Sequence, residues 1–131
     1  MFQWEEFHQI ATELLSNQQE AYIRCAASRY YYSIFGCSRE YLIDILHKYE
    51  FKDGNNIHKR VYEELIDSKD LNEINLAECL NFLRVIRNHA DYDKLDECPD
   101  YFKRNSEKII KRTNEAFESL NILRKNPPYE L

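Results

Sequence analysis

Residues 21–45 read AYIRCAASRYYYSIFGCSREYLIDI and contain no proline. Apolar side chains recur in this stretch every three or four residues: Ile23, Ala27, Tyr30, Ile34, Cys37, Tyr41 and Ile45. This spacing places them on one face of an α-helix. Extended to its polar flanks, the pattern predicts one helix over about residues 19–48, with Gly36 in its middle. A glycine inside a helix costs about 1 kcal/mol relative to alanine, so we expect another helix to pack closely against that position.

The rest of the chain has the same helical periodicity. Four further helices are predicted over about residues 2–16, 57–68, 73–92 and 100–125. The run KDGNN at 52–56 is typical of a turn, residues 93–99 form an acidic loop, and Pro127 and Pro128 end the last helix. The sequence therefore predicts a single domain over residues 1–131, folded as an all-α antiparallel bundle of about five helices.

Composition excludes several classes of protein. The 131 residues include only 2 Gly and 3 Pro, too few for the many tight turns of an all-β fold. The net charge of −5 argues against broad nucleic-acid affinity, although it leaves room for a local basic site. No apolar run is long enough to cross a membrane, and the acidic start MFQWEEFHQ does not resemble a signal peptide.

The cysteines and histidines give no sign of a metal site or a disulfide. The chain has 4 Cys and 4 His without the short spacings of metal ligands. Cys25, Cys37 and Cys79 lie among apolar residues, so we expect these three thiols to be buried and all four, with Cys98, to be free. We therefore expect a cytoplasmic protein without a metal or cofactor.

Polar side chains are densest in RVIRNHADYD, residues 84–93. Since a helix turns by about 100° per residue, one side should carry Arg84, Arg87, Asn88 and Asp91, and a neighbouring side His89 and Tyr92. One interpretation is an exposed helix end, with an Arg87–Asp91 ion pair worth a few tenths of a kcal/mol. The other is metal-free cleavage of RNA, in which His moves protons and Arg stabilises the charge that develops on the phosphate.

Two segments of the chain resemble the HEPN domains, small α-helical proteins of prokaryotic defence and toxin–antitoxin systems. AASRYYYSIFGCSREYL, residues 26–42, is similar to the long second helix of that family, and RNHADYD, residues 87–93, is similar to its arginine-containing helix. IHKRVYEELI, between them, is similar to the short third helix. The order and spacing of these segments agree over about residues 5–125.

The resemblance implies an active site of Arg, a polar residue directly after it, and His, with four to six residues between the Arg and the His. Two alignments are possible. Arg84 and His89 have the family spacing, with Val85 at the polar position, whereas Arg87 and Asn88 form the family dipeptide, with Tyr92 at the position of the His. We favour the second alignment, because Asn88 and the ADY ending then match together.

The resemblance also implies that the protein is a homodimer with a composite cleft and that its substrate is RNA. It would be a metal-independent endoribonuclease, as a toxin or defence effector. The alternative within the family is a binding or scaffold protein that does not cleave RNA and pairs with a toxin, antitoxin or nucleotidyltransferase. Outside the family, the sequence is compatible with a helical adaptor that docks a partner helix in a groove.

Two other segments are candidate RNA-binding surfaces. The predicted last helix carries a basic run for which we expect either phosphate contacts or a solvated face: Lys103, Arg104, Lys108 and Lys111. Arg29, with the tyrosines at 30–32, is either a base-stacking surface or part of the core stripe.

Overall fold

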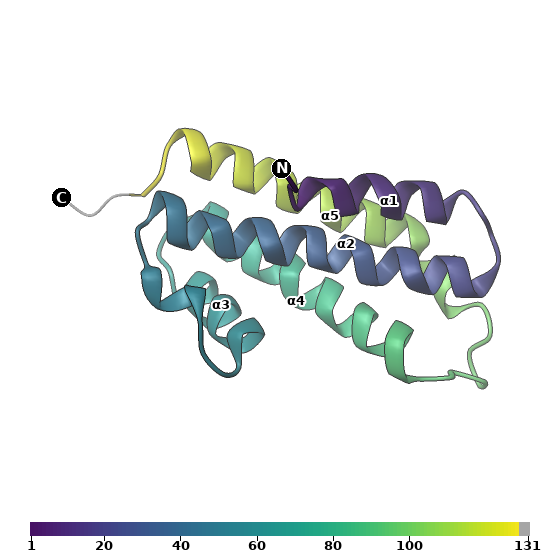
Figure 1. The fold of residues 1–131 in the computed structure, drawn as a ribbon. Helices are drawn as coiled ribbons and strands as arrows, with labels where there is room; N and C mark the ends of the chain where they lie inside the picture. Colours follow the sequence, from purple (N-terminus) through teal and green to yellow (C-terminus); the bar gives the residue numbers. More distant parts are fainter. Residues whose placement is uncertain (129–131) are drawn as a thin grey trace.

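In a computed structural model, residues 1–128 are described and form an all-α antiparallel bundle (Figure 1). The last three residues of the expected domain, 129–131, lie outside the described range. The α-helices are α1 (Glu5–Leu15), α2 (Glu20–Glu40), α3 (Ile57–Ile66), α4 (Leu71–Tyr92) and α5 (Tyr101–Lys125). A π-helical turn, η1 (Tyr41–Ile45), and a 3-10 turn, η2 (Tyr49–Lys52), connect α2 to α3. No strand occurs within residues 1–128, and the predicted fold class is confirmed.

Helix α2 lies at the centre of the bundle and contacts α1, α4 and α5 (Figure 1). The predicted stripe of this helix is buried from Ile23 to Tyr41, whereas its last member, Ile45, is half-buried. Tyr30, Tyr31 and Tyr41 are among the largest side chains with almost no exposed surface. Tyr30 and Tyr31 are both inward because α2 has neighbours on more than one side. The tyrosine run is therefore mostly core, and only Tyr32 is half-buried.

Gly36 packs directly against the N-terminal segment. A Cβ atom built on Gly36 would lie 2.1 Å from Cδ2 and 2.3 Å from Cγ of Trp4. The indole of Trp4 therefore occupies the space that any other residue at 36 would fill. The predicted close packing at this glycine is confirmed, but the partner is the side chain of Trp4, just before α1, rather than a residue within another helix.

The predicted end of the second helix is wrong. Regular α-helix ends at Glu40 rather than near residue 48, and the chain continues as the π-helical turn η1. The segment closes with the Lys48 N–H donating to the Leu42 carbonyl, and His47 takes the left-handed conformation, φ 57°. This position is usually Gly or Asn, so a histidine gave no sequence signal for the end of the helix.

Helix α4 is anchored at both ends. The Asp70 carboxylate accepts hydrogen bonds from the backbone N–H groups of Asn72 and Glu73, an N-cap that starts the helix two residues earlier than expected. At the other end the Arg24 guanidinium donates to the carbonyls of Ala90, at 3.1 Å, and Lys94, at 2.7 Å. These bonds fix the last turn of α4 against α2.

Two side chains lie outside the core, contrary to prediction. Cys25 is exposed, because it lies on the same side of α2 as the exposed Tyr22, three residues before it. Ile10 of α1, which helical spacing places on one apolar face with Ala11 and Leu14, is also exposed, and Ala11 is the buried residue of that helix. Cys37 and Cys79 are buried as expected, and Cys98 is exposed. Within the described chain, no helix has the length and apolar character needed to cross a membrane.

Candidate functional site

Arg87 on α4 is held in place by residues of two helices. Its Nη2 donates to the Tyr32 hydroxyl on α2 at 2.7 Å, and its Nη1 donates to Oδ1 of Asn88 at 3.0 Å. Its Nε lies 2.9 Å from Oδ2 of Asp91, but the N–H direction is unsuitable for a hydrogen bond, so this contact is an ion pair only. The guanidinium carbon also lies 5.2 Å from the ring centre of Tyr32 and 5.5 Å from that of Tyr92.

Arg84 lies about one helical turn before Arg87 on the same side of α4. It is half-buried, and within residues 1–128 it has no hydrogen bond and no acidic partner. Its positive charge acts on Tyr31 and His58, so its side chain extends toward α2 and α3. We call Arg84, Arg87, Tyr32 and Asn88 the arginine site; they share one surface, as the sequence predicts for the three α4 residues.

His89 lies apart from this site. Its Nδ1 is 2.7 Å from Oδ2 of Asp93, and its ring meets Tyr101 of α5 edge to face at 5.5 Å. The expected grouping of His89 with Tyr92 is therefore not what the structure shows, since Tyr92 lies against Arg87. The contacts of His89 are with Asp93 and Tyr101 rather than with Arg84. The arrangement thus brings Arg87, Asn88 and Tyr92 together and leaves His89 outside.

His58 borders the arginine site, although sequence reasoning missed it. It is the second residue of α3, and its ring centre lies 6.0 Å from that of Tyr32 and 4.1 Å from that of Phe35. Its Nδ1 lies 2.5 Å from the Tyr31 hydroxyl. Burial, followed by the charges of Arg84, Arg87 and Arg39, lowers the pKa of His58. No local motif at residue 58 could have signalled this, because the neighbours come from α2 and α4.

The basic run on α5 forms a separate surface. Arg104, Lys108 and Lys111 are exposed along one line of α5, and Nζ of Lys108 lies 4.9 Å from the ring centre of Phe82 on α4. Phe82 is two residues before Arg84, about 160° away around α4. The basic run therefore lies on the opposite side of α4 from the arginine site. Lys103 is exposed on a third side, facing α1.

Arg29, the other sequence candidate on α2, stacks on aromatic rings. Its guanidinium carbon lies 4.8 Å from the ring centre of Phe7 and 5.1 Å from that of Tyr32. Arg29 thus covers Tyr32 from the α1 side, whereas Arg87 covers it from α4. The exposed stacking surface considered from the sequence is reduced to one half-buried tyrosine between two arginines.

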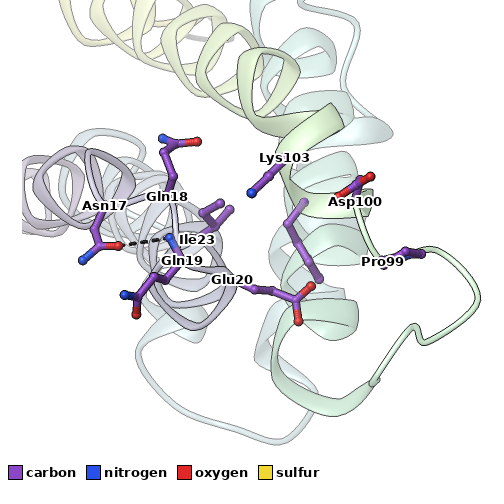
Figure 2. A pocket seen from close by; sticks show the side chains of 9 residues that line it. Asn17, Gln18, Gln19, Glu20, Ile23, Pro99, Asp100 and Lys103 are labelled. Carbon is purple, nitrogen blue, oxygen red and sulfur yellow. Dashed lines mark hydrogen bonds between the residues drawn. The ribbon is translucent and has the colours of Figure 1, made fainter.

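A hollow of about 510 Å³ lies away from the arginine site, between the α1–α2 turn and the start of α5 (Figure 2). Gln18 and Gln19 line one side, and Asp100 and Lys103 line the other (Figure 2). These are solvent-facing groups of mixed charge and do not converge on one point, so we assign the hollow no role. No three His, Cys, Asp or Glu side chains within residues 1–128 are placed to hold a metal ion.

Comparison with known proteins shows a similarity to an archaeal protein. The chain is 36% identical over 109 residues to the uncharacterized protein MJ0992 of Methanocaldococcus jannaschii. The alignment covers 71% of this chain and 62% of that protein, so the chain matches about three fifths of the length of its relative. No family model matches the chain, and no solved structure matches it. The resemblance to HEPN domains therefore rests on the residues of this chain alone.

Proposed function

We propose that this HEPN-like protein acts on RNA and binds its phosphodiester backbone at the arginine site. The observation that carries the proposal is that only one of two adjacent arginines is neutralised. Arg87 has Asp91 at 2.9 Å, whereas Arg84 has no acidic partner within residues 1–128. A guanidinium group carries its charge at any physiological pH and fits the oxygens of a phosphate in pairs. Arg84 supplies a guanidinium group that can bind two phosphate oxygens, beside Arg87, which Tyr32 and Asn88 hold in place.

The aromatic rings around the arginines favour single-stranded RNA as the ligand. Tyr92 is 73% exposed and lies against Arg87, and Tyr32 is half-buried beside it. Proteins that bind single strands combine cationic side chains for the backbone with aromatic rings on which bases stack. Because the whole chain carries a charge of −5, we expect binding to be confined to this site and to weaken steeply with salt.

Cleavage of the bound RNA is the second candidate, as a metal-independent endoribonuclease toxin or defence effector. Two guanidinium groups favour it, because they can stabilise the charge that develops on phosphorus when the 2′-hydroxyl attacks. His89, whose Nδ1 is held by Asp93, does not offer a base beside Arg87. We therefore expect slow cleavage that persists in excess EDTA and leaves 2′,3′-cyclic phosphates.

A two-fold dimer would place two copies of the site in one cleft, as the HEPN resemblance implies. One line along α4 is exposed at intervals of three and four residues and is available for such a contact: Asn81, Val85, Asn88 and Tyr92. Val85 and Tyr92 supply apolar surface, and interfaces are rich in tyrosine. An antitoxin or a nucleotidyltransferase is the alternative partner for this line.

The test is binding of a fluorescein-labelled 12-nucleotide oligouridylate, followed by fluorescence anisotropy at low salt. We expect Arg84→Ala and Arg87→Ala each to weaken binding by about tenfold or more, because a hydrogen bond to a charged group contributes about 1.5–3 kcal/mol. Lys69→Ala is the matched control, since it removes one positive charge just before α4 begins, about 20 Å from Arg84.

Three results would contradict the proposal. If Lys69→Ala weakens binding as much as Arg84→Ala, the effect is one of overall charge. If changes at Arg104, Lys108 and Lys111 abolish binding and those at the arginine site do not, RNA binds the α5 surface. A protein that retains no RNA at low salt would leave the scaffold and adaptor alternatives.

A further inference from the structure

His58 brings a third helix to the edge of the arginine site. Its ring stacks on Phe35, with centres 4.1 Å apart, and lies edge-on to Tyr32, with centres 6.0 Å apart. Tyr32 in turn accepts the hydrogen bond from Arg87. Helix α2 therefore contributes Tyr32, α3 contributes His58, and α4 contributes Arg84 and Arg87 to the same surface.

The Tyr31 hydroxyl determines which nitrogen of His58 carries the proton. This hydroxyl is fully buried, and its one partner within residues 1–128 is Nδ1 of His58 at 2.5 Å. A buried hydroxyl must donate its proton to avoid a desolvation cost. Nδ1 therefore accepts, and the proton of the neutral ring lies on Nε2. In the described chain Nε2 has no hydrogen-bond partner, and it is not among the buried polar atoms that lack one, so it reaches solvent.

We propose that His58 is the third donor of the phosphate site, with its Nε2–H directed at an oxygen of the phosphate that Arg84 and Arg87 hold. This inference rests on the proposed phosphate binding at the arginine site. It assigns the histidine a binding role rather than that of a base, because the nitrogen that faces the phosphate carries a proton, while Nδ1 is held by the Tyr31 hydroxyl. Tyr31 acts here as a positioning residue.

Binding should then depend on pH in a defined direction. The charged groups facing His58 are Arg84 and Arg87 on α4 and Arg39 on α2, with Tyr31 as the neutral partner. Burial and these three arginines lower the pKa of His58. A bound phosphate offsets the arginine charges, so it should raise that pKa. Binding therefore takes up a proton at Nδ1, with the Tyr31 hydroxyl turning from donor to acceptor. Affinity should increase as the pH falls through the pKa of His58 in the complex.

Substitutions at residues 58 and 31 test this assignment with the oligouridylate probe. His58→Phe keeps a ring on Phe35 and removes both nitrogens; we expect it to weaken binding about tenfold. Tyr31→Phe in the same chain removes the hydroxyl that would otherwise be left unpaired, so the double variant should fold and bind as weakly. His58→Gln retains an N–H donor near the position of Nε2 and should restore binding to within about threefold.

Titration of the His58 imidazole by NMR, with inorganic phosphate as a second probe, separates the two proposals. A phosphate-dependent rise in the pKa of His58, absent in Arg84→Ala, supports the inference. Unchanged RNA binding in His58→Phe, with binding lost in Arg84→Ala, overturns the role of His58 and leaves the proposed function intact. If the protein does not bind RNA, the proposed function fails, and the phosphate titration alone tests the role of His58. If phosphate then leaves the pKa of His58 unchanged, the inference about His58 is overturned as well.

Discussion

Gly36→Ala should destabilise the protein, although the same change in an open helix would stabilise it. With free space at residue 36, replacing glycine by alanine inside α2 would gain about 1 kcal/mol. Here the added methyl would lie 2.1 Å from Cδ2 of Trp4, well inside van der Waals contact. The clash can be relieved by separating α1 from α2 or by expelling the indole.

Both routes lead to a similar magnitude. Overpacking a core costs about 1–3 kcal/mol, and exposing a large apolar side chain costs about 1.5–3 kcal/mol. After the gain in helix propensity, we expect a net loss of about 1–2 kcal/mol in the free energy of unfolding. For a chain of this size, that corresponds to a fall of about 3–8 °C in Tm.

Thermal and urea unfolding can be followed by circular dichroism and by the fluorescence of Trp4, the 1 Trp in the chain. Trp4→Leu in the same chain is the control, because the smaller side chain leaves room for the methyl and Gly36→Ala should then be neutral or stabilising. A higher Tm for Gly36→Ala alone would refute the close packing of Trp4 on α2.

Three further predictions concern the thiols, the end of α4 and assembly. Cys25 and Cys98 should react with a thiol reagent in the native protein, whereas Cys37 and Cys79 should react only on unfolding, because burial raises the pKa of both thiols; rapid reaction of all four would contradict their placement. Arg24→Ala should lower the free energy of unfolding by about 2–3 kcal/mol, because several hydrogen bonds from a charged group to carbonyls are lost. The substitution should also speed amide exchange after the last turn of α4. Unchanged exchange there would show that Arg24 does not hold that turn in place. Light scattering at micromolar concentration should give twice the mass of one chain, and a clean monomer mass would count against the composite cleft.

The helices could be predicted from sequence because burial repeats at a fixed period along each of them. The stripe of α2 and the close packing at Gly36 both follow from local spacing. The end of α2 does not, since it depends on a left-handed His47 rather than on Gly or Asn. The exposure of Cys25 also could not be predicted, because it depends on which sides of α2 the other helices leave uncovered.

The candidate site was predictable only as far as it lies on one helix. The Arg87–Asp91 ion pair follows from helical spacing and is present. The hydrogen bond from Arg87 to Tyr32 joins residues 55 positions apart, and the sequence alone does not specify it. His58 was missed for the same reason.

The most direct test of the central claim is to locate the RNA on the protein. A single-stranded oligonucleotide containing 4-thiouridine can be cross-linked by light, and the modified peptide identified by mass spectrometry. We predict cross-links in the peptides that contain Tyr32 and Tyr92, lost in Arg84→Ala. Cross-links confined to residues 103–111, or unchanged by Arg84→Ala, would contradict the assignment of RNA binding to the arginine site.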